Sequence, residues 1–266
     1  MEIGASSACF YPLETEKSLL HIAELGFKHC EIFINSPSEL NRSFIYEMKT
    51  IKDAYSMDIV SLHPYGSFAE GYNFFSGYYR RFSDGVEDYK RYFEAARILG
   101  AKYVVMHGAR KRIDISVQEY AERFGKLNAV AQSFGCSVAH ENVVKFVSAY
   151  PEFMGYLKDY LGDNFKMVLD VKQARRAGVD VNEFIEVMGK SIAHVHLSDY
   201  SSERDCIPPS PQGLFDFESL FRALHKVGYD GRYIIELYSN GFLKRKEIKQ
   251  SAAYLEEILT SVRTKT

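Results

Sequence analysis

The sequence lacks the patterns that mark several large classes of protein. Its four cysteines form no C-x-x-C pair, which argues against a zinc clip or a disulfide framework and fits a reducing cytosol. No run approaches the roughly 18 apolar residues of a membrane span, and no basic leader precedes a long apolar stretch at the start. These absences predict a soluble, cytoplasmic protein that is not bound to a membrane.

The sequence also lacks a large excess of charge of one sign and a glycine-rich turn that binds phosphate. The net charge is -2 with no block of like charge, which removes the electrostatic basis for binding nucleic acid or an anionic membrane. No G-x-G-x-x-G turn follows the first apolar run, which disfavours an open dinucleotide-binding sheet. Small molecules are therefore the expected partners, and the composition is also compatible with a homo-oligomer.

What the sequence does contain is a regular alternation of two patterns. Short apolar, β-rich runs predict eight strands at 3–10, 30–34, 59–63, 103–107, 137–141, 167–170, 192–197 and 233–237. Stretches with helical spacing lie between them at 16–25, 86–99, 117–134, 153–161, 184–188, 217–227 and 247–262. Several of these helices should stop at a glycine cap, namely Gly26, Gly100, Gly135, Gly162, Gly189 and Gly228. The 266 residues, about 33 per unit, predict an α/β fold, a single (β/α)8 barrel domain over 1–266.

The longest stretch without predicted structure is 64–84, which is rich in aromatic residues. It could form a lid or a pocket wall, and a packed satellite cluster is equally compatible with its composition.

Polar residues recur where the predicted strands end, which in such a barrel is the face that carries the active site. They are Glu31, His63, His107, Glu141, Asn142, Asp170, His196, Asp199 and Glu236. A ring of buried carboxylates and imidazoles is costly unless positive charge sits among them, and a divalent cation supplies it.

The ligand set that we select comes from the last four strands: Glu141, Asp170, His196 and Glu236. Three carboxylates and one imidazole favour one Mn²⁺, with Mg²⁺, Co²⁺ and Zn²⁺ as alternatives. His194 lies two residues before His196 and should point the same way. Asp199 and Asn142 are expected to orient ligands from behind.

Seven segments in these contexts carry a family resemblance: "SLHPYG", "YVVMHGA", "VAHENV", "MVLD", "HVHLSD", "GYDGRYIIELY" and "SPQGLFDF". As a set they resemble the xylose isomerase-like superfamily of TIM barrels, which includes sugar isomerases and epimerases, inosose dehydratases and AP endonucleases. The resemblance implies that Glu141, Asp170, His196 and Glu236 match the family's metal ligands and that Glu141 and Glu236 match its proton-shuttling glutamates.

The activity that this resemblance implies is a metal-dependent isomerase or epimerase of a sugar or sugar phosphate, working through an enediolate that the metal stabilises. A dehydratase of the inosose or dehydroshikimate type is an alternative on the same metal site, because the same intermediate can expel a hydroxyl. A non-catalytic sugar-binding barrel and a nuclease are alternatives of other classes.

The chain departs from its relatives at several positions. The family often continues its sixth strand as D-x-x-H, where this chain has Gln173, and the AP endonucleases need an Asp-x-His where this chain reads Asp205-Cys206-Ile207. The nuclease is therefore disfavoured. Arg204 is a displaced match for an arginine of the epimerases, and with His63, His107 and Gln173 it completes the expected substrate-binding set.

Two basic features near the strand ends stay open. Lys172 should share the rim with Asp170 if the sixth strand continues, where it would bind a substrate oxygen or act as an acid or base; an ion pair with a ligand carboxylate is the alternative. The clusters 110–112 and 175–176 could meet a substrate phosphate or carboxylate, or could be solvated loop charge.

Overall fold

Eight parallel strands close into one barrel in the order in which they occur along the chain. This computed structural model describes residues 2–111 and 114–265. The strands are β1 Ile3–Ser6, β2 His29–Ile34, β3 Asp58–Pro64, β4 Tyr103–Met106, β5 Ser137–Glu141, β6 Lys166–Asp170, β7 Ile192–Leu197 and β8 Arg232–Ile235. Ile3 of β1 pairs with Tyr233 of β8, which closes the ring and confirms the predicted (β/α)8 fold.

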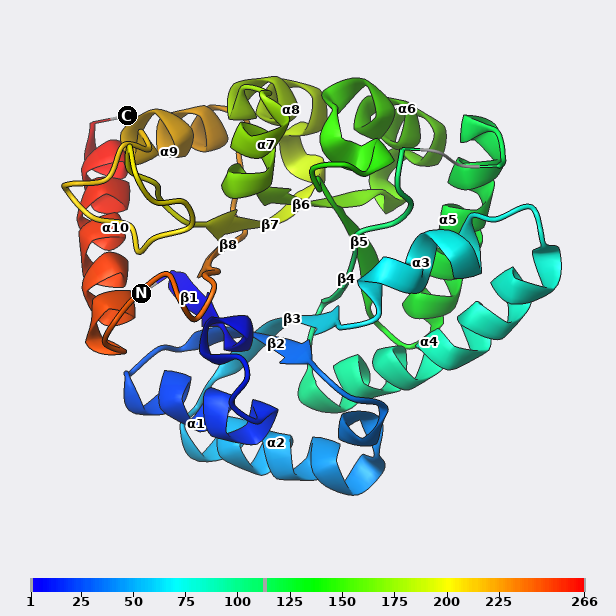
Figure 1. Cartoon of the computed structure of the whole chain (residues 1–266), viewed down its shortest axis with the longest axis horizontal. Helices are drawn as coiled ribbons and strands as arrows, with labels where there is room; N and C mark the ends of the chain where they lie inside the picture. Colours follow the sequence, from blue (N-terminus) through cyan, green and yellow to red (C-terminus); the bar gives the residue numbers. More distant parts are fainter. Residues whose placement is uncertain (1, 112–113, 266) are drawn as a thin grey trace.

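The helices form a ring outside these strands, as Figure 1 shows, with α10 beside β1. They are α1 Thr15–Glu24, α2 Arg42–Ala54, α3 Ser67–Phe74, α4 Tyr79–Leu99, α5 Val117–Ser133, α6 Pro151–Leu161, α7 Val171–Ala177, α8 Val181–Met188, α9 Phe217–Lys226 and α10 Lys246–Thr264. Within the described part of the chain, no helix combines the length and apolar character that crossing a bilayer requires.

Three helices escaped the sequence pattern, and two predicted elements need correction. Helices α2, α3 and α7 were not predicted, and the stretch 64–84 is not irregular because it forms α3 and the start of α4. The first strand is shorter than predicted, since the Ser6 side chain accepts a hydrogen bond from the amide of Ala8 and starts a 3-10 turn at Ser7–Phe10. The aromatic residues of 64–84 divide between two environments: Phe74 and Phe75 are buried, whereas Phe68 and Tyr72 are exposed.

Glycine ends the helices at the predicted positions. Gly100 follows α4 with φ at 77°, a left-handed conformation that favours glycine, and the next amide, of Ala101, donates to the carbonyl of Ala96. All six predicted cap glycines have positive φ. These sharp turns return the chain to the next strand.

The apolar core lies mainly between the strands and the helices, and a smaller cluster belongs to the strands alone. Its members are Val105, Ala139, Val168 and Ala193. Val105, Ala139 and Val168 each stand two residues before a polar strand-end residue, so their side chains share the inward face with His107, Glu141 and Asp170. On the inner face of the barrel, the strands therefore carry apolar side chains in their middle and polar side chains at their carboxyl ends.

Candidate active site

The four predicted metal ligands converge at the carboxyl ends of the strands. Glu141 ends β5, Asp170 ends β6, His196 lies near the end of β7 and Glu236 follows β8 directly. One possible ligand atom from each of the four lies within 4.8 Å of the others. Barrel closure brings together residues that span almost a hundred positions of sequence.

The atoms at the centre of this cluster suit a divalent cation. Nδ1 of His196 lies 3.5 Å from Glu141 Oε1, 3.7 Å from Glu236 Oε2 and 3.9 Å from Asp170 Oδ2. Among the described residues, buried Nδ1 of His196 has no hydrogen-bond partner, and buried Oδ2 of Asp170 has only an ion pair with Nζ of Lys172 at 3.3 Å. Since buried acceptors without hydrogen bonds are costly, a cation bound by these two atoms and by the two glutamates would lower the penalty.

Asp170 is held in place by hydrogen bonds to helix α7 and to Asn142, which directly follows β5. One carboxylate oxygen, Oδ1, accepts a hydrogen bond from the amide of Gln173 at 2.9 Å and so caps α7, which leaves Oδ2 facing the cluster. The Asn142 side chain accepts from the Asp170 amide at 2.7 Å and donates to its carbonyl at 3.0 Å. Asn142 thus fixes the backbone of a candidate ligand.

Lys172 reaches the same cluster, but from a helix and not from a strand. The sixth strand ends at Asp170, as predicted, and the condition that it continue to Lys172 is not met, because the chain turns into α7 at Val171. Nζ nevertheless lies 2.9 Å from Glu236 Oε2 and 3.3 Å from Asp170 Oδ2. Burial alone would lower the pKa of Lys172, but the charges of Asp170 and Glu236 outweigh it and raise the pKa well above its usual range. Lys172 therefore forms the ion pair with candidate ligand carboxylates that the sequence left open as an alternative.

A second group on the other side of Glu141 contains two predicted substrate-binding residues. Nε2 of His107 lies 2.8 Å from Glu141 Oε2, and Nε2 of His63 lies 3.4 Å from it. Burial would lower the pKa of His63, yet the charges of Glu141 and Glu31 raise it to about 9. One possible ligand atom from each of His63, His107 and Glu141 lies within 4.8 Å of the others, so these side chains are also close enough to share a metal ion.

The loop that carries His107 is fixed by Glu70, which the sequence analysis did not identify. Oε2 of Glu70 accepts hydrogen bonds from the amides of His107 and Gly108 at 2.8 and 2.7 Å, and Oε1 accepts from the Tyr89 hydroxyl at 2.7 Å. A Cβ at Gly108 would lie 2.1 Å from the Tyr120 hydroxyl, so this turn needs glycine. No local sequence pattern reveals Glu70, because its partners come from the loop after β4 and from α4.

A cavity of about 430 Å³ opens above both groups. Glu141, Glu236, Lys172, His63 and His107 line it, and so does Gln173, whose side chain also accepts from the Val144 amide at 3.1 Å. Aromatic walls are supplied by Tyr11, Phe33, Tyr65 and Tyr238. This size falls within the range of small-molecule sites.

Two predicted site residues have their contacts elsewhere. The Arg204 guanidinium donates to the carbonyls of Gly241 and Asn240 at 2.8 and 3.3 Å, and Arg204 does not line the cavity. The Asp199 carboxylate accepts from backbone amides of its own loop, including those of Leu214 and Phe215 at 3.0 Å each. Asp199 thereby organises the β7–α9 loop.

The basic clusters also have partners of their own. Arg175 and Arg176 both pair with Asp205, and Arg176 donates to the Tyr238 hydroxyl at 2.9 Å. In the other cluster, Arg112 lies outside the described residues, and Lys111 donates to the Tyr150 hydroxyl at 3.0 Å.

The family model described as xylose isomerase-like TIM barrel matches residues 19–258, most of the chain. The chain belongs to this family. A curated relative, the inosose isomerase of Bacillus velezensis, is 24% identical over 173 residues, which cover 60% of this chain and 61% of the relative.

Two solved structures show the same fold. A D-tagatose 3-epimerase-like protein has a TM-score of 0.80 at 23% identity, and the match covers 100% of this chain and 99% of the epimerase-like chain. The IolI protein with a binding zinc atom has a TM-score of 0.79 at 18% identity, and the match covers 98% of this chain and 99% of the IolI chain. Sugar epimerases and an inosose isomerase are therefore among the structural and sequence neighbours of this family member.

Proposed function

We propose that this protein is a metal-dependent isomerase or epimerase of a sugar or sugar phosphate. The observation that carries the proposal is the shared position of Glu141 and Glu236. Both line the cavity, and both belong to the candidate ligand cluster with Asp170 and His196. Two carboxylates that face one substrate next to a cation are the groups that moving a proton beside a carbonyl requires.

Each group has a definite part in the proposed reaction. A divalent ion held by the cluster, with Mn²⁺ preferred for its mixed oxygen and nitrogen ligands, would acidify the C–H between a substrate carbonyl and hydroxyl. One glutamate accepts this proton, and the other delivers a proton to the opposite face or to the neighbouring carbon. Lys172 lies against Glu236, where its ammonium can donate a hydrogen bond to a substrate oxygen.

The cavity favours an unphosphorylated sugar over a sugar phosphate. Lys172 is the one lysine or arginine among the described residues that line it, and this lysine already faces two carboxylates. Arg175 and Arg176 are paired with Asp205. Aromatic walls suit the C–H faces of a free sugar, whereas a phosphate dianion would need unpaired cations.

The nuclease alternative has weaker support. A third cation site of the kind that AP endonucleases use would draw on positions 173 and 205 to 207. Gln173 offers an amide that bonds the Val144 backbone, and Asp205 is held by two arginines.

The proposal is tested with Mn²⁺-loaded protein and a panel of ketoses, their phosphates and inososes in D₂O. Products are followed by NMR and mass spectrometry. We expect deuterium at one carbon of an isomeric product, and at least a hundredfold loss of turnover in Glu141→Gln and in Glu236→Gln. Glu186→Gln, on the exposed face of α8, is the matched control and should retain full activity.

Three results would contradict the proposal. Loss of water from the substrate would identify a dehydratase. Cleavage of DNA containing abasic sites would identify a nuclease. Sugar binding without turnover, unchanged in both glutamine variants, would identify a binding protein.

A further inference from the structure

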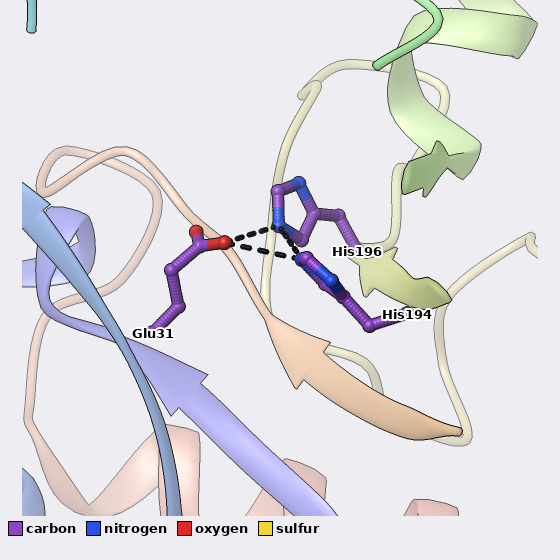
Figure 2. Close-up of side chains that lie close together, drawn as sticks. All are labelled: Glu31, His194 and His196. Atoms are coloured by element: carbon purple, nitrogen blue, oxygen red, sulfur yellow. Dashed lines mark hydrogen bonds and ion pairs between the residues drawn. The ribbon is translucent and has the colours of Figure 1, made fainter. Parts of the chain in front are cut away.

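Directly behind the candidate metal ligands, three side chains meet inside the barrel. Figure 2 shows Glu31 from β2 pointing at His194 and His196 from β7. Oε2 of Glu31 lies 3.1 Å from Nε2 of each histidine, and the two Nε2 atoms are 3.1 Å apart. All three side chains are sealed from solvent, with exposures of 0% to 1%. Neither Glu31 nor His194 has a part in the chemistry described above.

The surrounding hydrogen bonds decide where the histidine protons lie. The Ser61 hydroxyl donates to the same Glu31 oxygen at 2.7 Å, and the Ser6 hydroxyl donates to the other oxygen at 3.2 Å, so the carboxylate acts as an acceptor on both sides. Nδ1 of His194 has no hydrogen-bond partner among the described residues. A proton there would be a buried, unsatisfied donor. We therefore place a proton on Nε2 of His194, donated to Glu31.

His196 follows from the same reasoning, with a different consequence. Its Nε2 lies 3.1 Å from Glu31, which can only accept, and 3.1 Å from Nε2 of His194, whose proton is already donated to Glu31, so we place a proton on Nε2 of His196 as well. Its other nitrogen, Nδ1, then faces the oxygens of Glu141, Glu236 and Asp170 at 3.5 to 3.9 Å. A histidine binds a metal through an unprotonated nitrogen, and which nitrogen this is depends on the hydrogen bond that the other one makes.

We propose that Glu31 is a positioning residue that holds His196 in the tautomer with its proton on Nε2 and its Nδ1 lone pair toward the metal. His194 is the second donor that fixes the Glu31 carboxylate in this orientation. The inference rests on the proposed function, because it presumes a cation among Glu141, Asp170, His196 and Glu236.

The first test measures Zn²⁺ affinity by competition with a chelator. Asp170→Asn examines the metal site itself, and we expect it to lose high-affinity binding. Glu31→Gln should bind Zn²⁺ ten to a hundred times more weakly although it removes no ligand, as is usual when a carboxylate behind a histidine ligand is replaced. Ser61→Ala, which removes one hydroxyl donor to Glu31, should lose less affinity than Glu31→Gln.

The second test begins with the wild-type protein, so it does not depend on whether a variant folds. In Zn²⁺-loaded wild-type protein labelled with ¹⁵N-histidine, long-range NMR spectra should show His196 with a protonated Nε2 and a metal-bound Nδ1. In Glu31→Gln, if it folds, the His196 signals should shift or broaden as the second tautomer becomes populated.

The outcomes separate this inference from the proposed function. Unchanged binding in Asp170→Asn overturns both. If Asp170→Asn loses Zn²⁺ binding, two results would overturn the positioning role alone. One is a Zn²⁺ affinity of Glu31→Gln within twofold of wild type, and the other is metal bound to Nε2 of His196. Two Zn²⁺ ions per chain, of which Glu31→Gln loses one, would make Glu31, His194 and His196 a metal site in their own right and would also overturn it.

Discussion

Replacing Lys172 by methionine separates two effects of its ammonium. Nζ lies 3.3 Å from Asp170 Oδ2 and 2.9 Å from Glu236 Oε2, both of which are proposed ligand atoms. An ion bound to Asp170 through a bond of about 2.1 Å would lie within about 5.4 Å of Nζ unless the lysine moved. The metal and the ammonium should therefore compete for the same carboxylates.

The magnitude of this competition follows from Coulomb's law. A double and a single positive charge about 5.4 Å apart repel each other by about 6 kcal/mol at an effective dielectric constant of about 20. Movement of the flexible side chain and entry of water remove most of this energy. If a quarter survives, about 1.5 kcal/mol, Lys172→Met should bind Mn²⁺ about tenfold more tightly than wild type.

Turnover should move in the opposite direction. If Lys172 also donates to a substrate oxygen, Lys172→Met should lose at least tenfold in kcat/KM while it binds metal more tightly. Titration calorimetry with Mn²⁺ and steady-state kinetics on one protein preparation measure both effects. Lys190→Met, at the opposite end of the barrel, is the matched control and should change neither.

Either half of the reasoning can fail separately. Mn²⁺ affinity that is unchanged or weaker in Lys172→Met would refute competition between the ammonium and the ion. Full turnover in the variant with metal bound would refute the role of Lys172 in the reaction.

Three further predictions concern residues that support the site. Burial lowers the pKa of His140 to about 4, so the unfolded chain binds a proton that the folded protein excludes; the resulting stability is complete above pH 6.5 and is lost as the pH falls toward 4. Urea unfolding of chelator-treated wild-type protein at pH 7 and at pH 5 measures this loss. When the pH falls from 7 to 5, the free energy of unfolding should decrease by about 2 kcal/mol less in His140→Gln than in wild type. Asp199→Ala should lower the free energy of unfolding by about 2 kcal/mol, because it leaves three partly buried amides of the β7–α9 loop without their acceptor; a loss below about 0.5 kcal/mol would contradict this account. Asn142→Ala should weaken Mn²⁺ binding about tenfold in a calorimetric titration, because the backbone of Asp170 loses both of its side-chain hydrogen bonds; affinity equal to wild type would show that Asp170 needs no such support.

The barrel and its ring of polar strand ends were predictable because both depend on repeated local patterns. Apolar runs, helical spacing and cap glycines each occur many times, so an error in one unit leaves the others intact. The convergence of Glu141, Asp170, His196 and Glu236 then follows from closure, which brings every strand end to one face.

Helix α7 is absent from the sequence prediction because its seven residues, Val171–Ala177, are too few to show a clear helical spacing. Asp170 is both a candidate ligand and an N-cap, and Gly178 ends the helix with φ at 72°. An aspartate before a seven-residue stretch and a glycine after it are a signal that the sequence does contain. The missed turn changes how Lys172 reaches the site, although the lysine still faces Asp170.

Other features depend on contacts that no local pattern encodes. Glu31 and His196 are 165 residues apart, and their contact arises only when β2 and β7 face each other across the barrel. Glu70 acts on His107 from a helix that the sequence analysis did not predict. Arg204 matched a family position in sequence, but its guanidinium is taken up by the carbonyls of Asn240 and Gly241.

The most direct test of the central claim is anomalous diffraction from a crystal of the protein soaked in Mn²⁺. The account predicts one strong peak per chain, ligated by Glu141, Asp170, His196 and Glu236, with Lys172 displaced from the carboxylates that it contacts without metal. Absence of a peak at these four residues under saturating Mn²⁺, or a principal peak at His63 and His107 instead, would contradict it.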